Sequence, residues 1–235
     1  MGNSWFQFQQ FRVEQDRCAM KISTDAVLLG SLAEGEDAKT ILDIGTGTGV
    51  ISLMLAQRFE QANIFAIEID QDAFEQARMN FEQSIFSDRI EILQGAIQDL
   101  KKKSSFDLIV SNPPYFPDHL KSPDSKRNQA LHTDSLSFED LASSVDQLLS
   151  KDGAFWVILP PRQMAELELI FSKLGFNSGK DIHVQDRPGK AVHRIVRSFH
   201  RTIQEKRQTR IFIKEDSGDY SELYKSLISG FLLGF

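Results

Sequence analysis

The stretch Asp43-Ile44-Gly45-Thr46-Gly47-Thr48-Gly49 decides the fold of this chain. It joins a β-branched apolar run, 40–44, to an apolar-periodic segment, 50–59, and so predicts a tight turn between a strand and a helix. Three glycines let the backbone turn sharply and approach a ligand closely, because no Cβ stands in the way. In open α/β sheets such a turn lies at the carboxyl ends of the strands, where ligands bind.

Strand and helix patterns alternate on the C-terminal side of this turn. Strands are predicted at 40–44, 63–68, 89–93, 106–111 and 154–159, and helices at 50–59, 72–83, 138–150 and 162–174. Later strands are predicted at 182–185, 191–199 and 210–213, followed by an amphipathic helix around Leu223, Leu227 and Phe231. We therefore expect an α/β, Rossmann-like, doubly wound fold whose mostly parallel sheet has seven strands and an antiparallel edge strand.

The chain carries no internal repeat and no long linker, so we expect one domain over 1–235. It comprises an N-terminal cover and helix (1–30), a Rossmann-like core (31–200) and a C-terminal strand and amphipathic helix (201–235).

The composition, with 41% hydrophobic and 26% charged residues, is that of a soluble globular protein. Cys18 is the single cysteine, which excludes an intramolecular disulfide and a Cys-based zinc site and favours a reducing compartment. A net charge of −6 argues against a protein that coats DNA. We expect a cytoplasmic protein with no metal and no membrane segment, and we favour a monomer.

The spacing of the glycines indicates which ligand the turn binds. The pattern is Gly-x-Gly-x-Gly, whereas the dinucleotide fingerprint has its third glycine one position later, where this chain has Val50. Asp43 is a poor neighbour for a pyrophosphate but suits a cationic amino acid ligand. These features favour S-adenosylmethionine, whose amino group and sulfonium are positive, over NAD or FAD.

Glu68 ends the second predicted strand, where a carboxylate can accept hydrogen bonds from both ribose hydroxyls of the cofactor. Asp70, two residues further on, competes with Glu68 for this role.

A second motif, Asn112-Pro113-Pro114-Tyr115, follows the predicted strand 106–111 and so lies at the same end of the sheet. Two prolines remove two donors and leave a rigid loop that presents carbonyl oxygens. The Asn112 side-chain oxygen and the Pro113 carbonyl can each accept one N–H of an amide or aromatic amine, which aims its lone pair at a methyl sulfonium. Tyr115 offers a face on which a base can stack, for about 1–3 kcal/mol. We predict that these four residues form the catalytic segment.

The two motifs together resemble a known class of enzymes. The pairing of 43–49 with 112–115 is similar to class I S-adenosylmethionine-dependent methyltransferases that modify exocyclic or amide nitrogen. Within that class, the chain is similar to the bacterial tRNA1(Val) (adenine-N6)-methyltransferase family. The residues that carry this likeness are Phe8-x-x-Phe11, Gln15, Lys21, Thr24 to Gly30, Ile41 to Gly49 and Arg89-Ile90. The resemblance implies the class I fold, a tRNA substrate, and methylation of the adenosine 3′ to the anticodon, adenosine 37.

The resemblance also implies a set of cofactor contacts. In chain order these are Thr24, Asp25, Asp43, Gly45, Thr46, Gly47, Gly49, Glu68, Ile69, Ala96 and Asn112. Ala96 stands where many relatives have an Asp that contacts the adenine amine, so this contact must come from the backbone or from elsewhere. Leu131 stands where an Arg is expected, which weakens a substrate contact carried over to that position.

A basic segment supports a nucleic-acid substrate independently. Residues 180–214 contain ten Lys or Arg against three Asp or Glu. Arg194 and Arg197 lie on opposite faces of a predicted strand, so they cannot line one groove together. The expected phosphate contacts are Lys190, Arg201, Lys206, Arg207 and Arg210.

Other functions remain open at this point. A protein glutamine N5-methyltransferase needs the same two acceptors, although such enzymes usually carry a separate N-terminal helical domain that 30 residues cannot form. Ribosomal RNA is another possible substrate. A non-catalytic cofactor- or RNA-binding module is the alternative from a different class, and the intact Asn112–Tyr115 motif argues against it.

Overall fold

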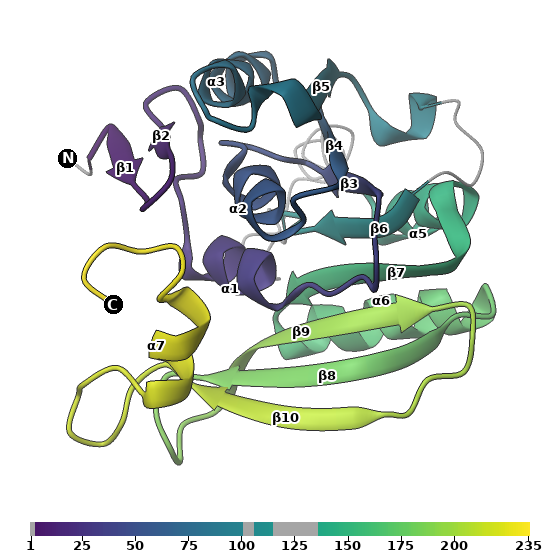
Figure 1. Ribbon diagram of the computed structural model, residues 1–235. Helices are drawn as coiled ribbons and strands as arrows, with labels where there is room; N and C mark the ends of the chain where they lie inside the picture. The colour runs from purple at the N-terminus through teal and green to yellow at the C-terminus, as the bar shows by residue number, and fades with distance from the viewer. Residues whose placement is uncertain (1–2, 101–105, 115–135) are drawn as a thin grey trace, which may run out of the picture.

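The computed structural model describes residues 3–100, 106–114 and 136–235. Its centre is an eight-stranded sheet in the order β10-β8-β9-β7-β6-β3-β4-β5 (Figure 1). The strands are β3 (Thr40–Ile44), β4 (Asn63–Glu68), β5 (Ile90–Gln94), β6 (Phe106–Ser111), β7 (Leu149–Leu159), β8 (Asn177–Gln185), β9 (Val192–His200) and β10 (Arg207–Phe212). A separate hairpin of β1 (Trp5–Gln7) and β2 (Arg12–Glu14) precedes them.

Helices cover both faces of this sheet (Figure 1). One face carries α1 (Thr24–Leu32), α2 (Val50–Arg58), α3 (Gln71–Glu82) and the C-terminal α7 (Glu222–Ile228). The other carries α5 (Phe138–Leu148) and α6 (Pro161–Lys173). Two short 3-10 helices, Ser87–Arg89 and Ile97–Asp99, flank β5.

Alternating side chains of the strands build two hydrophobic cores. In β3, Ile41 packs with α1 and α2, whereas its neighbour Leu42 packs with the opposite helices. In β6, Leu108 and Ile109 divide in the same way. A strand whose residues are apolar on both faces is typical of a buried parallel sheet, and the predicted doubly wound α/β fold is confirmed.

Two details of the predicted sheet are wrong. Within the described residues the sheet has eight strands rather than seven, and its antiparallel strand, β9, lies between β7 and β8 rather than at the edge. The reason is that β10 pairs in parallel with the far side of β8 and so becomes the outermost strand. Chain order does not reveal this lateral placement.

Side-chain caps begin several of the helices. Ser23 accepts a hydrogen bond from the Ala26 amide at the start of α1, and Asp70 accepts one from Ala73 at the start of α3. The C-terminal helix follows the same rule at Ser221. Of the apolar residues predicted for it, Leu223 is 52% exposed, whereas Phe231, just after the helix, is buried. Tyr224 and Ile228 are buried as well, since α7 packs against α1.

Because most strands of the sheet run in the same direction, its two ends are distinct. We call the end where β3, β4, β5 and β6 finish the carboxyl edge, and the end where they begin the amino edge. β7, β8 and β10 run with them and β9 runs against them, as the arrowheads in Figure 1 show. The turn 186–191, between β8 and β9, therefore lies at the carboxyl edge, and the connection 201–206, between β9 and β10, lies at the amino edge.

Candidate functional site

A cavity of about 400 Å³ opens at the carboxyl edge of the sheet. Five segments line most of it: 18–20 before α1, the glycine turn after β3, 67–70 after β4, 95–98 after β5 and 111–114 after β6. Its volume is in the range of small-molecule sites. The glycine turn and the described part of the second motif, Asn112–Pro114, therefore meet in one cavity.

The glycines of the turn have two different roles. Gly45 and Gly47 line the cavity with φ of 72° and 55°, and a Cβ added to either would meet no protein atom within 4 Å. The same holds for Gly95 across the cavity. A Cβ on Gly49, by contrast, would lie 2.4 Å from a ring carbon of Phe81. Gly45, Gly47 and Gly95 thus leave room for a ligand, whereas Gly49 allows the turn to pack on α3.

Asp43 lies beneath the turn and does not line the cavity. Its side chain is fully buried, and its Oδ2 accepts hydrogen bonds from Thr46 Oγ1 at 2.6 Å and Ser52 Oγ at 2.7 Å. Burial raises the pKa of Asp43 to about 6. Its Oδ1 is buried with no hydrogen-bond partner among the described residues. The structure therefore places Asp43 and Thr46 as supports of the turn, and their predicted contact with the cofactor stays a prediction.

Glu68 joins the end of β4 to the glycine turn. Its Oε2 accepts a hydrogen bond from the Gly47 amide at 2.8 Å, and its Oε1 accepts from the amides of Ile69 and Asp70 at 2.9 and 3.0 Å. The side chain is 8% exposed and lines the cavity. A carboxylate oxygen has two acceptor sites, so Oε2 can accept one further hydroxyl.

Asp70, the competitor of Glu68, lines the same cavity. Its Oδ1 caps α3 by accepting from the Ala73 amide at 2.8 Å, while its Oδ2 accepts no hydrogen bond within the described part of the chain. The structure thus brings both carboxylates to the same cavity, and the ribose contact stays a prediction.

The segment Ser111–Pro114 also lines the cavity. Ser111 Oγ donates to the Ile44 carbonyl at 2.9 Å, which ties the end of β6 to the end of β3 beside the glycine turn. Asn112 is half-buried, Pro113 buried and Pro114 exposed. Tyr115, predicted to stack on the substrate base, lies outside the described residues, as does Leu131.

Ile69 and Ala96, two of the residues predicted to contact the cofactor, line the cavity, and their contact with the cofactor stays a prediction. Ile69 is 60% exposed, an unusual state for an apolar side chain beside a cavity. The Gly95 amide donates to the Glu68 carbonyl at 2.9 Å, which holds this wall against the carboxylate. Ala96 brings no side-chain acceptor, whereas Gln98 lines the same wall with an amide that the sequence analysis did not single out.

The segment 18–20 is a further part of the site that the sequence analysis missed. Two buried amides of α3 hold the chain that leads to it: Gln76 Oε1 accepts from the Arg17 amide at 3.0 Å, and Asn80 exchanges hydrogen bonds with the backbone of Glu14. Asn80 also donates to the Thr48 carbonyl in the glycine turn. Buried amides four residues apart on an otherwise apolar helix face were the available signal.

The cavity lining does not include Thr24 or Asp25, the first two residues of α1. Asp25 Oδ2 instead accepts from Arg194 Nε at 2.6 Å. Their role in binding the cofactor stays a prediction. Cys18 does line the cavity, and burial raises the pKa of its thiol to about 12, so the thiol is neutral at physiological pH.

The five residues predicted to contact nucleic acid do not share one surface. Lys190 lies at the carboxyl edge, whereas Arg201, Lys206 and Arg207 lie at the amino edge and Arg210 lies within β10. Arg201 Nη1 is 2.8 Å from Asp146 Oδ1, and Arg207 Nη2 is 2.7 Å from Glu205 Oε2.

The open glycines and the two carboxylates fit S-adenosylmethionine. Gly45 and Gly47 leave space beside Asn112, where a methionine moiety would lie, and Glu68 and Asp70 offer acceptors for the ribose. The described residues contain no group of three or more His, Cys, Asp or Glu side chains that could hold a metal ion.

Comparison with known proteins gives consistent results. The model of the methyltransferase small domain family matches residues 20–174. The tRNA1(Val) (adenine(37)-N6)-methyltransferase of Pedobacter heparinus is 41% identical over 230 residues, with 98% of each chain covered. The protein of the same name from Phocaeicola vulgatus is 43% identical over 233 residues, with 99% of each covered.

The solved structure of a predicted O-methyltransferase from Agrobacterium tumefaciens matches this chain with a TM-score of 0.69 and 22% sequence identity. The match covers 88% of this chain and 96% of the Agrobacterium chain. This likeness supports the fold alone. The predicted resemblance and the predicted cofactor are confirmed by the family and its near relatives. The chain therefore belongs to the methyltransferase small domain family, as a near relative of the tRNA1(Val) (adenine(37)-N6)-methyltransferases, and is an S-adenosylmethionine-dependent methyltransferase.

Proposed function

We propose that this enzyme transfers the methyl group of S-adenosylmethionine to N6 of adenosine 37 in tRNA1(Val). The observation that carries the proposal is that Asn112–Pro114 shares one cavity with the glycine turn and Glu68. A nitrogen held by the first segment would thus lie beside a cofactor held by the other two. Near relatives named for this reaction match the chain over almost its full length, which supports the same substrate.

Asn112 and Pro113 would orient the reacting nitrogen. S-adenosylmethionine, when bound, supplies a methyl group on a positively charged sulfur. The exocyclic amine of adenine is a weak nucleophile because its lone pair is conjugated to the ring. If the Asn112 side-chain oxygen and the Pro113 carbonyl each accept one N–H, the nitrogen moves toward tetrahedral geometry and its lone pair faces the methyl group. This is catalysis by positioning and electrostatics, and it needs no strong base.

The remaining residues of the cavity would hold the two reactants. Glu68 and Asp70 would accept the ribose hydroxyls, while the hydrogen bond from Gly47 to Glu68 keeps the turn in place. Ile69 would cover one face of the cofactor adenine, which explains its exposure without a ligand. Tyr115 would stack on the substrate base.

One incubation tests the proposal. The purified protein is incubated with labelled S-adenosylmethionine and total tRNA, the RNA is digested, and the labelled nucleoside is identified. We expect N6-methyladenosine, located at position 37 when individual tRNAs are mapped. If only ribosomal RNA is labelled, or only glutamine in an added protein extract, that acceptor and not tRNA is the substrate. Absence of label from every acceptor would favour a non-catalytic module.

Among the described residues no helix is both long and apolar enough to cross a membrane. The cytoplasmic location and the monomeric state stay predictions from the sequence.

A further inference from the structure

The basic segment 180–214 is divided by the fold between two distant ends of the sheet. β9 has nine residues, so at about 3.3 Å per residue its two ends lie about 30 Å apart. The turn 186–191 is at one end, with the catalytic segment, and the connection 201–206 is at the other. RNA contacts close to the transferred methyl group must come from the first end.

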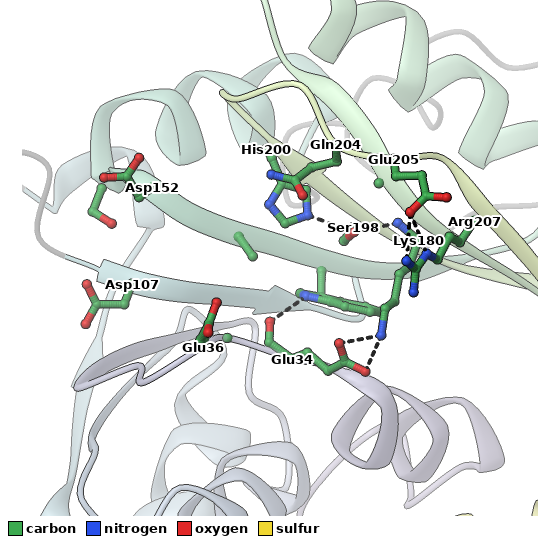
Figure 2. A pocket seen from close by; sticks show the side chains of 15 residues that line it. Glu34, Glu36, Asp107, Asp152, Lys180, Ser198, His200, Gln204, Glu205 and Arg207 are labelled. Carbon is green, nitrogen blue, oxygen red and sulfur yellow. Dashed lines mark hydrogen bonds and ion pairs between the residues drawn. The ribbon is translucent and has the colours of Figure 1, made fainter.

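The amino edge is unsuited to phosphate. A cavity of about 510 Å³ opens there, and Figure 2 shows carboxylates from several elements around it, among them Glu34, Glu36, Asp107 and Asp152. The cations beside it are already paired: Lys180 Nζ lies 2.5 Å from Glu34, and the Arg207 guanidinium is paired with Glu205 (Figure 2). An RNA backbone at this end would meet more negative charge than positive.

The turn between β8 and β9 presents its cations differently. The Lys190 amide donates to the Arg187 carbonyl at 3.2 Å, and Gly189 has a φ of 75°. With Pro188 before that glycine, the segment matches a type II β-turn, which brings the Cα atoms of its first and fourth residues within about 7 Å. Arg187 and Lys190 are those residues, so the turn brings the backbone positions of two basic residues close together.

The charges of this turn are available to a ligand. Lys190 is exposed, and the Arg187 side chain is 41% exposed. Arg187 Nε is buried, has no hydrogen-bond partner among the described residues and lies 3.4 Å from Asp186 Oδ2, so this ion pair is looser than the 2.7 Å pair of Arg207 with Glu205. The turn itself is anchored, because the Gln185 side-chain amide donates to the Lys190 carbonyl. A half-exposed guanidinium beside an exposed ammonium is a good phosphate partner.

The turn also lies at a suitable distance from the catalytic segment. β9 is two strands from β6 and β8 is three, and strands are about 4.8 Å apart, so the turn lies about 10–15 Å to the side of Asn112. The registers place Asn112 level with Val196, six residues from Lys190, so the turn also extends roughly 20 Å beyond Asn112 along the strands. The combined separation, about 25 Å, is the span of a few nucleotides. We infer that Arg187 and Lys190 bind RNA phosphates a few nucleotides from the reacting adenosine, an inference that rests on the proposed function.

The test compares three double variants that each remove two positive charges. Arg187→Ala/Lys190→Ala removes the turn cations, Lys206→Ala/Arg210→Ala removes the two rival cations on the β9–β10 side, and Lys39→Ala/Lys151→Ala is a control for lost net charge. Binding of tRNA is measured by filter retention over a range of salt, together with KM for tRNA and binding of S-adenosylhomocysteine by calorimetry.

We expect the turn variant to lose about tenfold or more in tRNA affinity at low salt. The slope of log affinity against log salt should become shallower by up to about 0.9 for each lost contact. Binding of S-adenosylhomocysteine should stay within twofold of wild type. The charge-retaining variant Arg187→Lys/Lys190→Arg should recover most of the affinity. The loss should persist with an isolated anticodon stem-loop, because the contacts are within a few nucleotides of the reacting base.

The inference is overturned if the turn variant binds tRNA like the control, or if the Lys206/Arg210 variant alone loses affinity. In both cases wild type still methylates tRNA and the proposed function stands. If wild type neither binds nor methylates any tRNA, the proposed function fails and the inference fails with it.

Discussion

The two ends of the central sheet each carry a cavity, and the larger of the two is not the one proposed for the chemistry. The amino-edge cavity, of about 510 Å³, is lined by charged side chains, and its cations, Lys180 and Arg207, are paired with Glu34 and Glu205. The carboxyl-edge cavity, of about 400 Å³, is lined by glycines at which an added Cβ would meet no protein atom, and by the exposed side chain of Ile69. Glu68 also lines it, and backbone amides hold its carboxylate in place. Groups that are already paired have little left for a ligand, so the state of the lining, and not the volume, identifies the site.

The largest expected effect comes from the carboxyl edge. Asn112→Ala should lower kcat more than about 100-fold, or roughly 2.7 kcal/mol, because it removes an acceptor for the amine in the transition state. Affinity for S-adenosylmethionine should stay within a few-fold. Glu36→Ala, in the amino-edge cavity, is the matched control and should retain wild-type turnover. Near-normal methylation by the Asn112 variant would remove the proposed mechanism.

Two glycines of the turn have different roles, which their alanine variants can distinguish: Gly49 packs against α3, whereas Gly47 lines the cavity. Gly49→Ala should destabilise the protein by about 2–4 kcal/mol. Residue 49 has a positive φ, which strains an alanine backbone, and the new Cβ would collide with Phe81. Gly47→Ala meets no protein atom and should cost only about 1–2 kcal/mol of stability, but it should weaken binding of S-adenosylhomocysteine. Urea denaturation and calorimetry of both variants give the comparison. Equal losses of stability would contradict the division of roles.

Glu68→Ala should weaken binding of S-adenosylmethionine and S-adenosylhomocysteine alike, by about 1.5–3 kcal/mol, since both ligands contain the ribose and the hydrogen bonds go to a charged group. The structure adds a second cause, because the Gly47 amide loses its acceptor. Isothermal calorimetry with both ligands measures the effect, with Asp70→Ala as the parallel variant. Unchanged affinity in the Glu68 variant alone would transfer the ribose contact to Asp70.

Asp43, buried beneath the glycine turn at the carboxyl edge, should make the stability of the protein depend on pH. Burial raises its pKa from 3.8 to about 6, so the folded protein keeps a proton that the unfolded chain releases between these values. The contribution of Asp43 to stability therefore falls as pH rises through this window. Between pH 4.5 and 6.5, wild type should lose about 2 kcal/mol that Asp43→Asn does not lose, as measured by urea denaturation. Parallel stability curves for the two proteins would show that Asp43 does not titrate in this range.

Much of the fold was predictable because local patterns and tertiary packing agree. The strands 40–44, 63–68 and 106–111 have the boundaries read from their apolar runs, since each is buried on both faces. β8 begins at Asn177, earlier than predicted, because the polar run 177–181 becomes a strand only through pairing with β9 and β10. No periodicity within that run could reveal its partners.

The site divides in the same way between sequence and tertiary structure. The glycine spacing, Glu68 and the Asn112–Pro114 segment follow from local chemistry, because each motif directly follows a strand and parallel strands bring their carboxyl ends together. The segment 18–20 and Gln98 were missed, because they enter the cavity through the path of the backbone rather than through a motif.

The sequence by itself determined the alternation of strands and helices, the class of cofactor and the chemistry of the acceptor segment, because these depend on residue types at fixed local spacing. Only the tertiary structure decided which basic residues share an end of the sheet with that chemistry. Arg187 and Lys190 are separated in the chain from Lys206 and Arg207 by a single strand, yet β9 carries the two pairs to opposite ends, because a strand is straight and extended.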